Sequence, residues 1–209
     1  MTNEIAAAIE DSISAVCQLK SAEGLNFIAK AATMIAEAFR AGNKIIIAGN
    51  GGSLCDATHF AEELTGQFRR YRPALPAIAL SDPGHITCTA NDMGFDRIFS
   101  RGVEAYGKKG DLFIGLTTSG NSPNIVNAMA TSEKMGLQTI AFLGKDGGKL
   151  KGFADLELII KGQTSDRIQE AHMTAIHIII EFVEKILYSP DQLQTEKLAA
   201  MLAKNTCQV

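Results

Sequence analysis

The stretch from Lys44 to Gly66, KIIIAGNGGSLCDATHFAEELTG, decides the fold. It opens with residues 45–48, Ile-Ile-Ile-Ala, a short apolar run rich in β-branched residues that predicts a buried strand. A glycine turn follows over residues 49–53, and a helix is expected to begin there with Ser53 as its N-cap. Free backbone N–H groups and the helix dipole then point at one spot, so this segment predicts an anion site.

The same helix is expected to carry His59 and Glu63 four residues apart, so that both side chains lie on one face. Such a pair can bind a metal, transfer protons or be an ordinary surface pair, and the last is the commonest case. A later helix, expected over 165–187, adds Gln169 and His177 two turns apart on a similar face. His177 stands in an apolar run, either as a core histidine or as a side chain that reaches into a site. Together the four residues are a plausible ligand set for zinc, although glutamine is an uncommon ligand.

A second strand–turn–helix unit repeats the first. Residues 112–116 predict a strand, and residues 117–124, TTSGNSPN, form a polar turn with Ser122 as the expected N-cap and Pro123 at the first helical position. In a parallel sheet both turns lie at the carboxyl ends of strands, where such folds bind ligands. One turn alone would only indicate helix capping, but two favour a phosphate monoester. Neither turn matches the P-loop pattern GxxxxGKS/T or the dinucleotide fingerprint GxGxxG.

The rest of the chain alternates strands and helices, which predicts an α/β fold with a mostly parallel five-stranded sheet covered on both faces. The two leading helices are alanine-rich and carry little charge on the apolar stripe. They either form a subunit interface or merely cover the sheet. The expected helices span 4–20, 23–41, 96–106 and, in the tail, 192–204, with another after Pro83 that breaks at 91–94; the further strands span 77–80, 137–143 and 156–160.

Composition is that of an ordinary globular protein: 209 residues, 46% hydrophobic and 21% charged. The net charge of −3 gives no signal for nucleic acid or an anionic membrane, and the run from Arg69 to Arg72 is interpreted as a solvated or interface turn. Four cysteines follow no zinc or redox spacing and no signal peptide precedes them, so a reduced cytoplasm is expected. The apolar run at 176–180 is interrupted by histidine and glutamate nearby and does not predict a membrane span.

Five blocks carry a resemblance to a known family. They read GNGGSLCDATHFAEELTG, SDPGHITCTANDMGFDRIFSR, TTSGNSPN, GKDGGK and DRIQEAHMTAIHIIIEFVE. The serine- and threonine-rich turns resemble the sugar isomerase (SIS) domain, and the blocks in order resemble the bacterial sedoheptulose 7-phosphate isomerases, or phosphoheptose isomerases, more closely still. The resemblance covers nearly all of residues 40–188. It departs mildly at Thr117, where relatives often carry serine, and in the tail beyond Tyr188, which is longer than expected.

The resemblance implies conversion of D-sedoheptulose 7-phosphate to D-glycero-D-manno-heptose 7-phosphate, the first step toward the heptose of bacterial lipopolysaccharide or capsule. It implies a flavodoxin-like, three-layer α/β/α sandwich in one SIS domain over 1–209, with leading helices at 1–41, a core at 42–188 and a tail at 189–209. It also implies a cytoplasmic homotetramer with sites at subunit interfaces, one zinc per subunit, and no nucleic-acid or membrane partner.

Particular residues are implied by the same resemblance. The acid–base pair is Glu63 and His177, with Glu63 the base that moves a proton between C1 and C2 through an enediol. Tight zinc binding would make Glu63 a poorer base, so the zinc is structural or regulatory, or Glu63 shifts between roles. The zinc set is His59, Glu63, Gln169 and His177. The substrate set is Asn50, Gly51, Gly52, Glu63, Asn91, Asp92, Thr117, Thr118, Ser119, Ser122 and Gln169, with Ser53 beside them.

Two rival hypotheses remain at this stage. SIS-domain adaptors that bind the bacterial replication initiator share the fold, but they do not keep both side chains at the positions of Glu63 and His177. A sugar-phosphate sensor or another phosphosugar isomerase would keep the phosphate turns with a different acid–base set. The presence of both Glu63 and His177, with His59, favours the heptose enzyme.

Overall fold

The computed structural model describes residues 1–188 and contains one five-stranded sheet. All neighbouring strands are parallel, in the order β2-β1-β3-β4-β5, which confirms the predicted sheet. The strands are β1 (Ile45–Gly49), β2 (Ala77–Ala79), β3 (Leu112–Thr117), β4 (Gln138–Gly144) and β5 (Leu156–Ile160). The α-helices are α1 (Thr2–Cys17), α2 (Ala22–Arg40), α3 (Gly52–Thr65), α4 (Pro83–Met93), α5 (Ile98–Tyr106), α6 (Pro123–Met135) and α7 (Ser165–Leu187). The helix expected over 192–204 lies outside the described residues.

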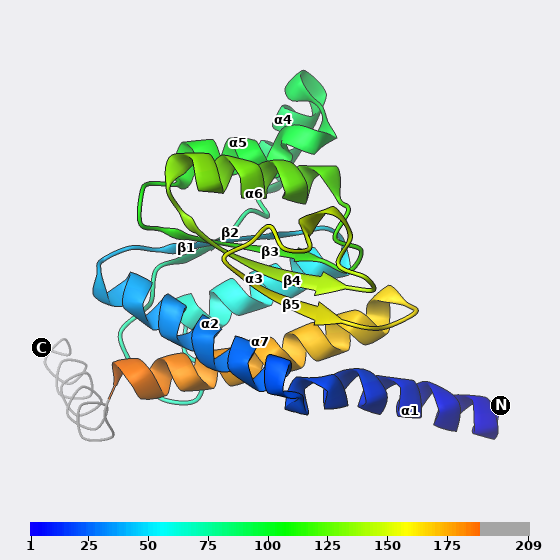
Figure 1. The fold of residues 1–209 in the computed structure, drawn as a ribbon. Helices are drawn as coiled ribbons and strands as arrows, with labels where there is room; N and C mark the ends of the chain where they lie inside the picture. Colours follow the sequence, from blue (N-terminus) through cyan, green and yellow to red (C-terminus); the bar gives the residue numbers. More distant parts are fainter. Residues whose placement is uncertain (189–209) are drawn as a thin grey trace, which may run out of the picture.

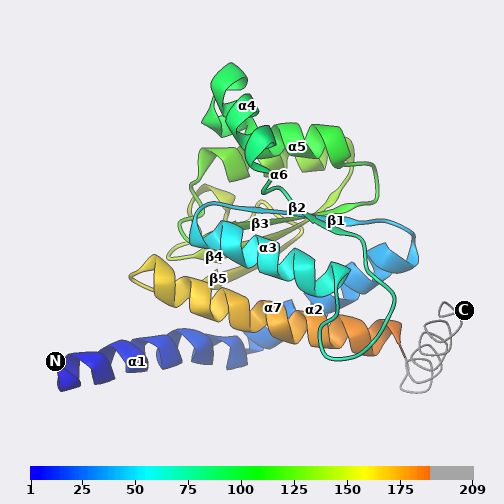
Figure 2. The same cartoon turned by 180° about the vertical axis from the view of Figure 1, so that it is seen from behind.

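Helices cover both faces of the sheet (Figures 1 and 2). α2, α3 and α7 pack on one face, and α5 and α6 pack on the other, with α4 standing out beyond α5. Alternate residues of the strands belong to two separate apolar clusters. Ile45 and Ile47 pack on the α2–α3–α7 side of the sheet, and Ile46 packs on the opposite side. This is the three-layer α/β/α sandwich that the alternation of elements predicts. None of the helices in residues 1–188 is both long and apolar enough to cross a lipid bilayer.

The strand order creates a switch point at one place along the carboxyl edge of the sheet. From β1 the chain crosses to β2 on one side and then returns to β3 on the other side of β1. The connections after β1 and β3 therefore lead away to opposite faces, and such a switch point is where open α/β sheets bind ligands. Gly49 of β1 is in register with Leu116 of β3, so the two glycine turns lie next to each other.

The expected N-cap of α3 is wrong. The helix begins at Gly52 and its N-cap is Gly51, whose φ of 56° lies in a region that glycine adopts without strain. Ser53 is buried inside the first turn instead. At the second turn the prediction is confirmed, since Ser122 is the N-cap of α6 and Pro123 is the first helical residue.

The two leading helices behave differently. α2 packs on the sheet and contributes Phe27, Ala31 and Ile35 to the core. α1 runs out past the start of α7, so that its first turns project from the body of the chain (Figures 1 and 2). Its apolar stripe is exposed, with Ile5 at 54% and Ile9 at 56%. Of the two roles expected for the leading helices, covering the sheet therefore accounts for the apolar stripe of α2 but not for that of α1.

Candidate functional site

The turn after β1 is fixed directly to the helix after β3. Asn50 and Asn124 exchange two side-chain hydrogen bonds, each amide nitrogen donating to the other's oxygen at 2.9 Å. Asn124 is buried at the start of α6, where its Oδ1 also accepts from the backbone N–H of Ile125 at 2.9 Å. This reciprocal pair holds the two glycine turns together as one unit, as a shared phosphate site requires.

Hydroxyl groups fill the second turn, and they divide into structural and available ones. Thr117 is buried, and its Oγ1 lies 3.0 Å from Ser122 Oγ, so this pair braces the turn from inside. Ser119 Oγ accepts from the N–H of Asn121 at 3.1 Å, and Thr118 Oγ1 lies 3.0 Å from Ser165 Oγ at the start of α7. Thr118 and Ser119 are only half-buried. Ser122 is half-buried too, but its hydroxyl is paired with Thr117, so Thr118 and Ser119 are the two hydroxyls of this turn best placed to meet a ligand.

A third loop, residues 145–150, supports this turn from behind. The N–H of Lys149 donates to Asn121 Oδ1 at 3.1 Å, and the N–H of Leu150 donates to the carbonyl of Gly120 at 3.2 Å. Gly120 has a φ of 64°, and a Cβ there would run into the backbone of Gly147. In the sequence analysis this segment served only as the GKDGGK block of the family resemblance, with no structural role assigned to it. Its paired glycines were the available signal for such a close backbone approach.

Gln169 of α7 lies against the first turn of α3. Its Nε2 donates to Ser53 Oγ at 3.4 Å. A Cβ on Gly52 would approach Gln169 Oε1 to 2.5 Å, so a larger residue at position 52 would displace the Gln169 amide. The structure thus brings together three residues of the predicted substrate set, Gly52, Ser53 and Gln169.

Farther along α3 and α7, three metal-ligating side chains converge. His59 and Glu63 of α3 and His177 of α7 each offer one ligand atom, and these atoms lie within 4.8 Å of one another. His59 Nε2 is 3.3 Å from Glu63 Oε1, and the rings of His59 and His177 have centroids 5.1 Å apart. His177 therefore reaches into a site and is not a core histidine. Two imidazoles and one carboxylate form the donor set of a typical three-ligand zinc site, so this triad could hold a metal ion.

The surroundings of His177 favour its neutral form. Burial lowers the pKa of His177, the charges of His59 and Arg69 lower it further, and Glu63 opposes them. The ring of Phe68 stacks on His177 with centroids 5.9 Å apart and an interplanar angle of 17°. A neutral imidazole is the form that can bind a metal or accept a proton.

Asp56, one turn before His59 on α3, was missed by sequence reasoning. Burial raises its pKa to about 6, against the opposing charge of His59, and its Oδ2 has no hydrogen-bond partner within residues 1–188. Asp56, Gln169 and His177 all line an open groove of about 910 Å³ that α1 and α7 flank. The spacing of three residues places Asp56 on the same face of α3 as His59, but sequence gives no sign of its burial.

Asn91 and Asp92 lie apart from these groups in the single chain. Both are exposed near the end of α4, which belongs to the opposite layer of the sandwich (Figure 1). Asn91 Nδ2 donates to Asp92 Oδ1 at 2.7 Å, and Asp92 Oδ2 accepts from Cys88. The structure does not bring these two predicted substrate residues to the His59–Glu63–His177 triad.

Comparisons with known proteins show the family of the chain. The SIS domain family model matches residues 9–144. A phosphoheptose isomerase from Fusobacterium nucleatum is 59% identical over 165 residues, which are 79% of this chain and 85% of that protein. Solved phosphoheptose isomerases from Neisseria gonorrhoeae and Francisella tularensis superpose with TM-scores of 0.82 and 0.84 at 34% identity, each covering 88% of this chain and 98% of the other. The fold and the paired hydroxyl turns thus define an SIS-domain protein. Within that class, the chain belongs to the phosphoheptose isomerase family of enzymes.

Proposed function

We propose that this enzyme converts D-sedoheptulose 7-phosphate to D-glycero-D-manno-heptose 7-phosphate, the first step of heptose synthesis for lipopolysaccharide or capsule. The convergence of His59, Glu63 and His177 carries the proposal, since these side chains come from the helix that follows the first turn and from the helix whose Gln169 contacts Ser53. A phosphoheptose needs an anion site at one end and acid–base groups at the other. That the sugar has seven carbons is taken from the names of the relatives, because the geometry of one chain does not show the length of the substrate.

The phosphate is held by the two turns. Backbone N–H groups at the start of α3 and the hydroxyls of Thr118 and Ser119 donate to its oxygens, and Gln169 orients the chain of the sugar from above Ser53. Asn50, Gly51, Gly52, Thr117 and Ser122 are the remaining predicted substrate residues of the two turns. Asn91 and Asp92 lie apart in the single chain and would join the set from a neighbouring subunit. Fixing the phosphate leaves the reacting carbons in one position relative to α3 and α7.

Proton transfer is assigned to Glu63 and His177. Glu63 removes a proton from C1 of the ketose, the C2 carbonyl oxygen gains a proton, and an enediol forms. Loss of the O1 proton and return of a proton to C2 then give the aldose, with no net change in protons or electrons. We assign His177 to the proton exchange at the two oxygens, and each group supplies on the order of 10²- to 10⁴-fold of rate.

Zinc is the proposed metal, one per subunit, held by His59, Glu63, His177 and Gln169. When bound, it would polarise the substrate carbonyl and stabilise negative charge that develops on oxygen. Glu63 would then both bind the metal and act as the base, and these roles oppose each other because binding to a cation lowers the basicity of a carboxylate. A reaction run in deuterium oxide tests the proton route: the enediol path incorporates solvent deuterium at C2 of the product, and complete retention of the C1 hydrogen at C2 would contradict it.

The triad also separates this proposal from the rivals. A sugar-phosphate sensor needs the phosphate turns and an adaptor needs the fold, but neither gains from a carboxylate placed 3.3 Å from a histidine nitrogen. Turnover of sedoheptulose 7-phosphate by the purified protein distinguishes the enzyme from both. A phosphate ester carries charge and does not cross a bilayer unaided, so we place the enzyme with its substrate in the cytoplasm.

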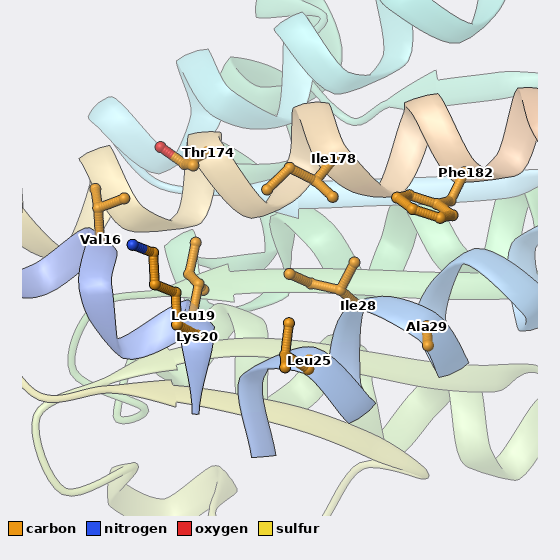
Figure 3. Close-up of a pocket in the computed structure, with 9 residues that line it drawn as sticks. All are labelled: Val16, Leu19, Lys20, Leu25, Ile28, Ala29, Thr174, Ile178 and Phe182. Atoms are coloured by element: carbon orange, nitrogen blue, oxygen red, sulfur yellow. The ribbon is translucent and has the colours of Figure 1, made fainter. Parts of the chain in front are cut away.

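A homotetramer with sites at subunit interfaces is our proposal for the assembly. Figure 3 shows an apolar pocket of about 290 Å³ between α2 and α7, where Ile28 faces Ile178 and Phe182. Leu25 at its rim is 59% exposed. This pocket shares Thr174 with the groove beside His177, so a partner packed here would also wall the site. Exposed apolar surface of this kind is typical of subunit interfaces.

The stripe on α1 gives a test of this assembly. Ile9→Glu should break the tetramer into smaller species, because it places a charge in the middle of the exposed stripe formed with Ile5 and Ile13. Light scattering coupled to size-exclusion chromatography measures the mass. Ala7→Glu adds the same charge on the opposite side of α1 and should leave the mass unchanged. A tetramer that survives Ile9→Glu would exclude this stripe from the interface.

A further inference from the structure

Arg72 is buried, contrary to the expectation of a solvated basic turn. Its side chain has no exposed surface, while Arg69 and Arg70 remain exposed. Its Nε donates to Glu184 Oε1 of α7 at 2.7 Å, and Glu184 is itself only 7% exposed. A buried charge of this kind is costly unless it is paired and hydrogen-bonded on every side.

The other end of the guanidinium closes helix α3. Nη1 donates to the carbonyl of Leu64 at 2.8 Å, and Nη2 donates to the carbonyl of Glu63 at 2.5 Å. Carbonyl groups at the end of a helix lack partners within the helix, and a cation there also meets the negative end of the helix dipole. Arg72 therefore holds the main chain of Glu63 itself.

Glu184 lies seven residues after His177, two turns along the same face of α7. The guanidinium group of Arg72 is rigid and planar, and it thus connects the main chain of Glu63 to the helix that carries His177. The segment between α3 and Arg72 adds a second contact, since Phe68 stacks on the His177 ring. The Arg69–Glu181 ion pair lies at the surface, where such pairs contribute little, and it is not part of this connection.

We propose that Arg72 is a positioning residue, which sets the separation of α3 and α7 at which Glu63 and His177 converge. This inference rests on the proposed function, because it assigns those two residues to proton transfer. Arginine is required and lysine is not equivalent, since only the guanidinium has enough donors in a fixed plane to reach Glu184 and two carbonyls at once.

The test compares Arg72→Lys and Glu184→Gln with Glu181→Gln, a matched control on the same helix whose partner Arg69 is exposed. Three quantities are measured on each full-length protein: the melting temperature, kcat and KM for sedoheptulose 7-phosphate, and the affinity of the chelator-stripped protein for Co²⁺ followed by its absorption spectrum. Arg72→Lys should lower kcat and the Co²⁺ affinity by on the order of 10- to 100-fold, with KM changed little. Glu184→Gln should lower the same two quantities by about three- to tenfold, and Glu181→Gln should change neither.

A lower melting temperature with kcat and Co²⁺ affinity equal to those of the wild type would show that the ion pair is only structural and would overturn the proposal. If Arg72→Lys does not fold, Glu184→Gln alone decides by the same criterion. If the wild type lacks isomerase activity, the proposed function fails, and the Co²⁺ affinities still decide whether Arg72 positions the triad.

Discussion

Glu63→Gln will bind sedoheptulose 7-phosphate and lose about 10²- to 10⁴-fold in kcat. The amide keeps the size of the side chain and one oxygen beside His59, but it cannot accept the C1 proton. Steady-state kinetics give kcat, and calorimetric titration gives substrate affinity, which should stay within a few-fold of the wild type. The metal content of the variant is measured in parallel, because the same carboxylate belongs to the triad.

Glu62→Gln is the matched control, since Glu62 is the adjacent residue and its side chain is 66% exposed. It should retain nearly full turnover. Near-normal turnover of Glu63→Gln with metal bound would remove Glu63 as the base. Equal losses in both variants would point to the charge of the helix and not to proton abstraction.

Replacing both available hydroxyls of the second turn, as Thr118→Val with Ser119→Ala, should raise KM by about 10²- to 10⁴-fold and leave kcat within a few-fold. Hydrogen bonds to a charged group contribute about 1.5–3 kcal/mol each, so the loss of two predicts an effect of this size. The inhibition constant of inorganic phosphate should rise with KM, because the same oxygens are recognised. Part of the effect will come from the Asn121 N–H, which loses its acceptor when Ser119 is replaced.

Ser165→Ala provides the control for this pair of changes. It removes the hydroxyl that contacts Thr118 but belongs to no predicted substrate set. Its KM should stay near that of the wild type. A double variant whose KM does not change would place the phosphate elsewhere, and a fall in kcat alone would assign these hydroxyls to the chemistry.

Local patterns were enough to predict the sheet. The apolar run at 45–48 and its counterpart at 112–116 became β1 and β3, because buried parallel strands need side chains that are apolar on both faces. The N-cap of α3 could not be read in the same way. Serine is a common N-cap residue, which is why Ser53 was expected to cap this helix. The positive φ of Gly51 lets Gly51 take that position two residues earlier.

The site was predicted less completely, because its remaining parts are contacts between distant segments. Spacing along α3 put His59 and Glu63 on one face, yet it could not show whether His177 faced them or the core. Nothing local distinguishes Arg72 from the exposed Arg69, since its burial depends on Glu184, 112 residues away. Asp56 was missed for the same reason, as its raised pKa comes from burial in the folded chain.

Isomerase activity with sedoheptulose 7-phosphate, measured on protein stripped with a chelator and then reloaded with zinc, tests the central claim most directly. We expect activity to disappear on stripping and to return with zinc, since His59, Glu63 and His177 converge on one point and could hold a metal ion. Absence of activity in both states, with the protein still folded and its assembly unchanged, would contradict the proposed function.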